Sequence, residues 1–223
     1  MRSWLRLGVP LAVFFIAFAI VVSLFWGSQQ TDEGRQTPVW NPTSAPSEAP
    51  PPTPEALPEG CSVPKPINPT RFAIERMGVD THVLSLGWDA TGAAAAPPDS
   101  DAFGVGWLNE GPQPGSERGN VVLTSHTYHV GSALGNLLYD AEKGLQAGDL
   151  IKMSDESGYT VCYRYREALK VWVAEYDQHP SDILYSDQGR PQLAMVVCWD
   201  WDWRARASQS RIIFYADPVV PAA

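Results

Sequence analysis

The stretch NVVLTSHTYHVG, residues 120–131, joins a run of β-branched and apolar residues directly to two of the chain's four histidines. The run 121–123 is typical of a buried strand, and that strand is expected to end near His126. Strand ends and the loops after them are where a rigid scaffold presents reactive side chains. His126 is therefore a candidate functional residue, and the question is which other groups the fold brings to it.

Short apolar runs of the same kind recur through the C-terminal two thirds of the chain. Clusters of Gly, Pro, Asn and Asp separate them, which is typical of an all-β barrel or sandwich. The runs are RFAIERM (71–77), THVLSLGW (81–88), DLIKMSD (149–155), YTVCYRYREALKVWVAEY (159–176), QLAMVVCWDW (192–201) and SRIIFYADPV (210–219). The sequence therefore predicts an all-β domain.

Two segments interrupt the strands with helical features. Residues 131–144, GSALGNLLYDAEKG, have apolar residues at helical spacing, including Leu134 and Leu138, and Gly144 is suited to end a helix. Residues 179–185, HPSDILY, are expected to form a short helical turn. The domain is thus expected to contain one or two short helices.

The N-terminal segment has a different character. Residues 8–26, GVPLAVFFIAFAIVVSLFW, carry no charge and are long enough to cross roughly 30 Å of hydrocarbon as a helix. Arg2 and Arg6 precede them, and positive charge favours the cytoplasm for that end. The alternative is a cleaved signal peptide, whose apolar region is usually about 7–15 residues long. The favoured prediction is a single-pass signal anchor at the cell membrane with an exported C-terminal domain.

A linker is predicted between the anchor and the domain. Residues 27–66 are rich in Pro, Ser, Thr, Gln and Glu, and cannot bury enough apolar surface to offset the entropy of ordering. Their proline clusters favour an extended spacer. The predicted organisation is a cytoplasmic N-terminus over 1–7, a transmembrane anchor over 8–26, a disordered linker over 27–66 and one domain over 67–223, which is large enough to own a core.

Charge and cysteine content narrow the function classes. A net charge of −9 argues against general nucleic-acid binding. With three cysteines, Cys61, Cys162 and Cys198, at least one lacks an intramolecular partner. Whether Cys61 and Cys162 pair depends on a Cα separation that the sequence does not contain. His126 and His129 lack the further ligands of a zinc site, so no metal is expected. No Gly-rich phosphate loop indicates an organic cofactor.

Three reactive side chains stand at the margins of predicted strands. Cys198 follows the run 194–197, Arg211 precedes the run 212–215, and His126 follows 121–125. A cysteine thiolate is a nucleophile, and a histidine acts as acid or base near neutral pH. A guanidinium is suited to stabilise a developing oxyanion. Together these residues predict a site for acyl transfer.

The segments that carry these residues resemble the sortases, the cell-wall transpeptidases of Gram-positive bacteria. The resemblance extends from Arg71 to Pro218 and looks most like the actinobacterial class F or class E groups. It lies in RFAIERMGVD (71–80), PDSDAFGVGWLNEGPQPGSERGNVVLTSHT (98–127), GNLLYDAEKGLQAGDLIKM (135–153), LAMVVCWDWD (193–202) and SRIIFYADPV (210–219). One departure is that the family's usual Thr-Leu-x-Thr before the cysteine is Ala-Met-Val-Val here, which leaves substrate details open.

The resemblance implies a fold, a mechanism and partners. The implied fold is a closed eight-stranded β-barrel. The Cys198 thiolate would attack the Thr carbonyl of an LPxTG-like sorting signal, Arg211 would stabilise the oxyanion or hold the peptide, and protonated His126 would give a proton to the leaving amine. An amine of a peptidoglycan precursor or of a pilin lysine would then resolve the thioacyl enzyme. The implied partners are sorting-signal proteins, an amine acceptor and, through the N-terminal helix, the membrane.

Two other interpretations compete with this one. An L,D-transpeptidase carries a Ser-His-Gly-Cys motif, whereas Thr127 and Tyr128 follow His126 here. A non-catalytic, stalked β-barrel scaffold at the cell surface is the alternative from a different class. Under the scaffold interpretation, the placement of a Cys, a His and an Arg at the margins of three predicted strands would be a coincidence.

Overall fold

The structure, a computed structural model, describes residues 56–178 and 183–221. The predicted anchor over 8–26 and the predicted linker up to residue 55 lie outside these ranges. Among the described residues, none of the helices has the length and apolar character that crossing a bilayer requires. The boundaries of the anchor and of the linker therefore stay predictions.

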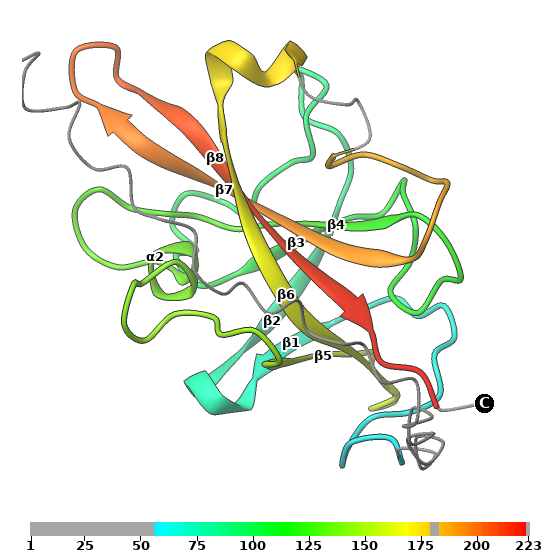
Figure 1. Ribbon diagram of the computed structural model, residues 1–223. Coiled ribbons are helices and arrows are strands. Elements are labelled where there is room, and N and C mark those ends of the chain that lie inside the picture. The colour runs from blue at the N-terminus through cyan, green and yellow to red at the C-terminus, as the bar shows by residue number, and fades with distance from the viewer. Residues whose placement is uncertain (1–55, 179–182, 222–223) are drawn as a thin grey trace, which may run out of the picture. The chain divides into compact units, whose positions relative to one another are not determined.

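Eight strands close into a barrel, which confirms the all-β class and the implied architecture (Figure 1). Their order around the barrel is β1-β2-β3-β4-β7-β8-β6-β5. The strands are β1 (Arg71–Ile74), β2 (Val79–Leu86), β3 (Val105–Leu108), β4 (Asn120–Thr124), β5 (Leu150–Ser154), β6 (Thr160–Trp172), β7 (Gln192–Asp202) and β8 (Ala207–Pro218).

Helical structure is short. Over residues 56–178 and 183–221 it comprises η1 (Glu75–Met77), α2 (Leu134–Leu138) and η2 (Val173–Gln178). The predicted helix over 131–144 ends early because the Asp140 carboxylate accepts the N–H groups of Glu142 and Lys143 and forms a turn instead. Of the helical turn predicted over 179–185, residues 179–182 lie outside the described ranges.

Side-chain alternation divides the barrel strands into an inner and an outer face. On β7, Leu193, Met195 and Val197 belong to the main core inside the barrel, whereas Ala194 and Val196 pack in a second cluster on the outside. The same alternation holds for β8, where Ile212, Phe214 and Ala216 point inward and Ile213 and Tyr215 point outward. On each of these strands every second residue therefore faces the core, and the residues between them face the outer surface.

Two strands that are far apart in the sequence run parallel at the centre of the sheet. Residues 120–124 of β4 pair with residues 192–196 of β7. Because parallel strands end at the same edge, the residues that follow Thr124 lie beside those that follow Val196. Strands β7 and β8 continue past this edge as an antiparallel hairpin, which reaches beyond the rest of the barrel (Figure 1).

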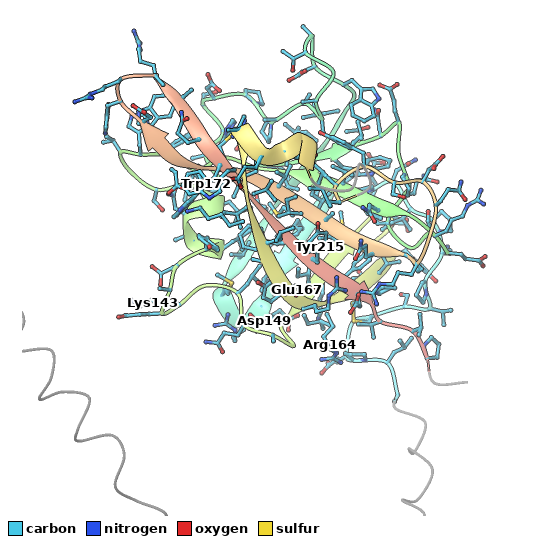
Figure 2. The ribbon with its side chains drawn as sticks, turned by 45° about the horizontal axis from the view of Figure 1, so that its top comes forward. Lys143, Asp149, Arg164, Glu167, Trp172 and Tyr215 are labelled. Atoms are coloured by element: carbon cyan, nitrogen blue, oxygen red, sulfur yellow. A yellow bond between two sulfur atoms is a disulfide. The ribbon has the colours of Figure 1, made fainter. Side chains whose placement is uncertain are left out.

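Strand β6 ends where this hairpin begins. The alternation in the sequence of β6 continues to Tyr176, but the chain leaves the sheet after Trp172, whose partner on β8 is Ser210. The residues of β8 that precede Ser210 pair with β7 and not with β6. Figure 2 shows the cross-strand partners Glu167 and Tyr215 together, with Trp172 further along β6 toward the hairpin. The segment after β6 becomes η2, which lies over the outer face of the sheet.

A disulfide joins the N-terminal end of the described chain to the barrel. Cys61 and Cys162 are bonded, with Cα atoms 5.7 Å apart. The N–H of Ser62 also donates to the carbonyl of Thr160, over 2.8 Å. The last residues of the segment predicted to be linker thus contact β6.

Candidate active site

Cys198 has an exposed thiol, and among the described residues it is the one cysteine outside a disulfide. Its exposure follows from the alternation of β7, since the preceding Val197 points into the core and is 2% exposed. Cys198 therefore lies on the outer face, in line with Ala194 and Val196. The sequence placed it at a strand exit, but β7 runs on to Asp202, so Cys198 lies within the strand rather than at its end.

Arg211 lies directly opposite Cys198 in the antiparallel pairing of β7 with β8. Directly opposed residues share a face, and their Cβ atoms are about 4.5–5.5 Å apart. Arg211 also donates to the carbonyl of Ser210 over 2.9 Å, which anchors the guanidinium beside its own strand. It is not the first residue of the last strand, as the sequence suggested, because β8 begins at Ala207.

His126 follows β4 at the edge where β4 and β7 lie side by side. Thr124 and Val196 are the last pair of this register, and His126 and Cys198 each follow that pair by two residues. The next residue, Thr127, joins the loop after β4 to β7, because its hydroxyl donates to the carbonyl of Cys198 over 2.5 Å. The imidazole is half-buried, and its Nε2 lies 2.8 Å from the carbonyl oxygen of Pro97.

The three predicted residues thus occupy three adjacent strands or their direct continuation. In sheet order these are β4, β7 and β8, with Cys198 between His126 and Arg211. This order allows the thiol sulfur to be reached from one side by an acid or base and from the other by a fixed positive charge.

A pocket of about 510 Å³ opens on the outer face beside Cys198 and Arg211. One wall is the loop after β2, including residues 91–94, and another is formed by η2 and the segment that follows it. Most of its lining is apolar or aromatic: Ala93, Ala94, Ala96, Val173, Tyr176, Leu184, Tyr185, Val196 and Val197. The dimensions and lining suit an extended peptide with apolar side chains.

The positive charge of Arg211 affects the pKa of two tyrosines that line this pocket. Burial raises the pKa of Tyr185 and the pKa of Tyr176, and the positive charge of Arg211 opposes both shifts. The Tyr185 hydroxyl accepts the N–H of Ala94 over 3.0 Å, which ties the loop after β2 to this wall. The guanidinium therefore faces the pocket, with neutral phenols as neighbours.

His129 has a different role from that of a metal ligand. Its ring stacks on Trp201, with centroids 4.7 Å apart, and meets the edge of Trp203 at 4.6 Å. Within the described ranges there is no group of three or more His, Cys, Asp or Glu residues that could hold a metal ion. His129 thus joins the loop after β4 to the β7–β8 hairpin.

The tryptophans after Cys198 divide between core and hairpin. Trp199 packs against the barrel core and against Tyr139, with ring centroids 4.9 Å apart. Trp201 takes part in the contact with His129, and both tryptophans line a second, smaller pocket of about 250 Å³ on the other side of β7.

Asp200 is a residue that the sequence did not single out. It adopts a φ of 52°, and its carboxylate accepts the Ser210 hydroxyl over 2.7 Å and pairs with the Lys170 ammonium over 2.5 Å. These contacts hold the main chain two residues after Cys198. No local signal distinguishes Asp200 from Asp202, because its partners come from β6 and β8.

Comparison with known proteins gives one family. Residues 72–219 match the family model described as the sortase domain. Similar solved structures include sortase C-1 from Actinomyces oris, with 21% identity over 69% of this chain and 76% of that one, at a TM-score of 0.45. Sortase A from Corynebacterium diphtheriae is 15% identical over 70% of this chain and 62% of that one, at a TM-score of 0.47. A search of curated proteins finds no match.

Proposed function

The chain belongs to the sortase family, and on this premise we propose that it is a membrane-anchored cysteine transpeptidase. It cleaves an LPxTG-like sorting signal after the Thr and joins the signal-bearing protein to an amine of the cell wall or of a pilin. The exposed Cys198 thiol, with Arg211 directly opposite on β8 and His126 in the loop that directly follows β4, is the observation that carries this proposal.

Cys198 acts as the nucleophile. Its sulfur attacks the Thr carbonyl carbon of a peptide that lies in the 510 Å³ pocket. The apolar walls of that pocket hold the residues on the N-terminal side of the scissile bond. Collapse of the tetrahedral intermediate breaks the C–N bond and leaves a thioester on Cys198.

Arg211 supplies the positive charge for the intermediate. Its position opposite Cys198 puts the guanidinium within reach of the oxygen on which negative charge develops. A preorganised cation contributes most where water is excluded, and the partly buried phenols of Tyr176 and Tyr185 cover part of the surface beside Arg211. The same guanidinium also holds a peptide carbonyl in the ground state.

His126 handles the proton. As the C–N bond breaks, the imidazolium gives its proton to the leaving amine and becomes neutral. In the second half of the reaction an acceptor amine attacks the thioester, the neutral imidazole takes the amine's proton, and the Cys198 thiolate leaves. Protons and charges are then as at the start.

The N-terminal sequence places this reaction at the outer surface of a membrane. The apolar segment 8–26 anchors the chain, and the Pro-rich linker lets the domain stand off the bilayer. Within the family, the sequence pattern supports a place in the actinobacterial class F or class E groups.

Incubation of the full-length protein with LPxTG-like peptides and an amine nucleophile tests the proposal. The expected result is a mass increase on Cys198 that equals the peptide up to its Thr, and transfer of that peptide to the amine. Cys198→Ala should abolish both products, and His126→Ala should prevent turnover. The scaffold interpretation would be favoured instead if no peptide became linked to Cys198 and a thiol-directed sulfonate reagent labelled that thiol no faster than an ordinary exposed cysteine.

A further inference from the structure

The imidazole of His126 has a hydrogen-bond partner that can only accept. Its Nε2 lies 2.8 Å from the main-chain oxygen of Pro97, and a carbonyl oxygen has no hydrogen to donate. Nε2 must therefore carry the hydrogen. A neutral imidazole has one such hydrogen, so Nδ1 is left with a lone pair.

The Pro97 carbonyl is held rigidly by its own sequence. Pro97 is buried, and its ring fixes its φ. Pro98 follows, and a residue before proline is confined to extended backbone. Two consecutive prolines thus leave the carbonyl between them little freedom to turn away from His126.

Side chains next to His126 clamp the same loop from two sides. The Thr124 hydroxyl donates to the carbonyl of Ala95 over 2.8 Å, and the Tyr128 hydroxyl donates to the carbonyl of Asp99. Thr124 and Tyr128 are each two residues from His126, and their acceptors are each two residues from Pro97. The loop before β3 is therefore hydrogen-bonded to the end of β4 and the loop after it at every second residue, namely 124, 126 and 128.

We propose that the Pro97 carbonyl selects the Nε2–H tautomer of His126, so that Nδ1 is the atom that exchanges the proton during transpeptidation. Tyr128 and Thr124 are positioning residues that act through this carbonyl. A nucleophile, a base and a third group that orients the base form a recurring catalytic arrangement, and here the third group is a main-chain oxygen. The role of Nδ1 in the reaction rests on the proposed function, whereas the tautomer does not.

The proton balance follows from this assignment. In the first half of the reaction, Nδ1 of the imidazolium gives its proton to the leaving amine. The hydrogen on Nε2 stays on that nitrogen throughout and remains hydrogen-bonded to the Pro97 carbonyl. In the second half, Nδ1 takes one proton from the attacking amine as the new C–N bond forms and the C–S bond breaks.

The tautomer is directly measurable by NMR of the full-length protein labelled with ¹⁵N-histidine. The spectra are followed with rising pH until the His126 ring signals stop changing, and in this neutral state they should report hydrogen on Nε2 and a bare Nδ1. Loss of those signals in His126→Gln identifies them among the four histidines. A wild-type spectrum with hydrogen on Nδ1, or with both tautomers averaged, overturns the inference.

Tyr128→Phe tests the clamp, with Tyr159→Phe as its matched control. Tyr159 also donates its hydroxyl to a main-chain carbonyl, that of Val63 over 2.7 Å, but on the β5–β6 side of the barrel. Tyr128→Phe should convert the His126 signals to a mixture of tautomers and lower kcat by about tenfold or more, since misplaced catalytic groups cost up to about 10²-fold. Tyr159→Phe should leave both unchanged.

Two further outcomes separate the inference from the proposed function. A lower kcat in Tyr128→Phe with an unchanged tautomer would overturn the clamp, and Thr124→Val provides the same test if Tyr128→Phe does not fold. An Nε2–H tautomer in a protein that forms no acyl peptide on Cys198 would overturn the proposed function alone. Acyl peptide on Cys198 with an Nδ1–H tautomer would overturn the inference alone.

Discussion

Asp200 links the main chain that carries the nucleophile to two other strands. Its left-handed backbone is uncommon for a non-glycine residue, although Asp tolerates it better than most. The conformation brings the carboxylate to the Ser210 hydroxyl and to the Lys170 ammonium. Ser210 is fully buried, so its hydroxyl depends on this partner.

Asp200→Ala is therefore expected to destabilise the domain by about 1–3 kcal/mol, because it leaves a buried hydroxyl without its acceptor and keeps the left-handed backbone. Chemical denaturation of the wild type and of the Asp200→Ala variant measures this loss of unfolding free energy. Asp200→Asn is the matched control: its amide oxygen still accepts from Ser210, so its loss should be smaller. Equal stability of the Ala variant and the wild type would show that Ser210 finds another acceptor.

The Asp200 carboxylate also predicts a pH dependence. Hydrogen bonds from Lys170 and Ser210 lower its pKa below the ordinary value of 3.8. A carboxylate with a lowered folded-state pKa contributes stability above its unfolded pKa and loses it as the pH falls through the folded value. The advantage of the wild type over Asp200→Asn should thus be present at about pH 6 and decrease as the pH falls below the ordinary value of 3.8. A difference in unfolding free energy that stayed constant over this range would contradict the prediction.

Arg211 is expected to act mainly on the transition state. Arg211→Ala should lower kcat/KM for an LPxTG-like peptide by about 10²–10³-fold, the usual loss for an oxyanion donor. Arg211→Lys should recover part of it, since the charge is kept but the planar fork of donors is not. Arg164, exposed on β6, is the control, and Arg164→Ala should behave as the wild type (Figure 2). A near-normal kcat/KM in Arg211→Ala would remove Arg211 from the mechanism.

Among the elements, the β7–β8 hairpin is the one that extends beyond the barrel. Near its tip the hairpin is contacted by the ring of His129, which stacks on Trp201 and meets the edge of Trp203. His129 belongs to the loop that follows His126. The position of the loop next to the active site therefore depends on an aromatic contact with the hairpin.

Trp201→Ala should loosen this loop. An aromatic contact worth about 0.5–1.5 kcal/mol predicts roughly two- to tenfold faster amide exchange over residues 127–133, measured by hydrogen–deuterium exchange. Trp172→Ala removes an exposed tryptophan at the end of β6 and serves as the control (Figure 2). Unchanged exchange in Trp201→Ala would show that the hydrogen bonds of Thr127 and Tyr128 suffice to hold the loop.

At the scale of the whole molecule, the disulfide closes the described domain into a large covalent loop. Cys61 and Cys162 are separated by 101 positions in the sequence. A loop of this length restricts the unfolded chain strongly. The bond therefore ties the entry point of the N-terminal segment to the side of the barrel formed by β5 and β6.

Cys61→Ser is expected to lower the stability by about 2–5 kcal/mol. A reductant should lower the melting temperature of the wild type to that of the variant and leave the variant unchanged. Cys61 is the better site for this test than Cys162, which is 1% exposed and also fills core volume. A reductant effect on Cys61→Ser would indicate that something other than this bond is being reduced.

The sequence predicted the strands better than it predicted the helices. The continuous apolar runs over 120–124 and 192–197 were enough to locate β4 and β7, because these residues are buried on both faces of the sheet. The helix over 131–144 was predicted too long, because the turn at Asp140 competes with the helix through a side-chain hydrogen bond. The resemblance supplied the number of strands and the family, which periodicity alone does not contain.

By itself, the sequence determined which residues have reactive groups and which face of each strand is buried, since both are local properties of a few neighbouring residues. The tertiary structure alone decided that Cys198 lies opposite Arg211, that His126 follows β4 at the edge where β4 pairs with β7, and that Cys61 is bonded to Cys162. These are matters of register between segments separated by long stretches of chain. Register is set when the whole barrel closes around one core, and no local stretch of sequence encodes that closure.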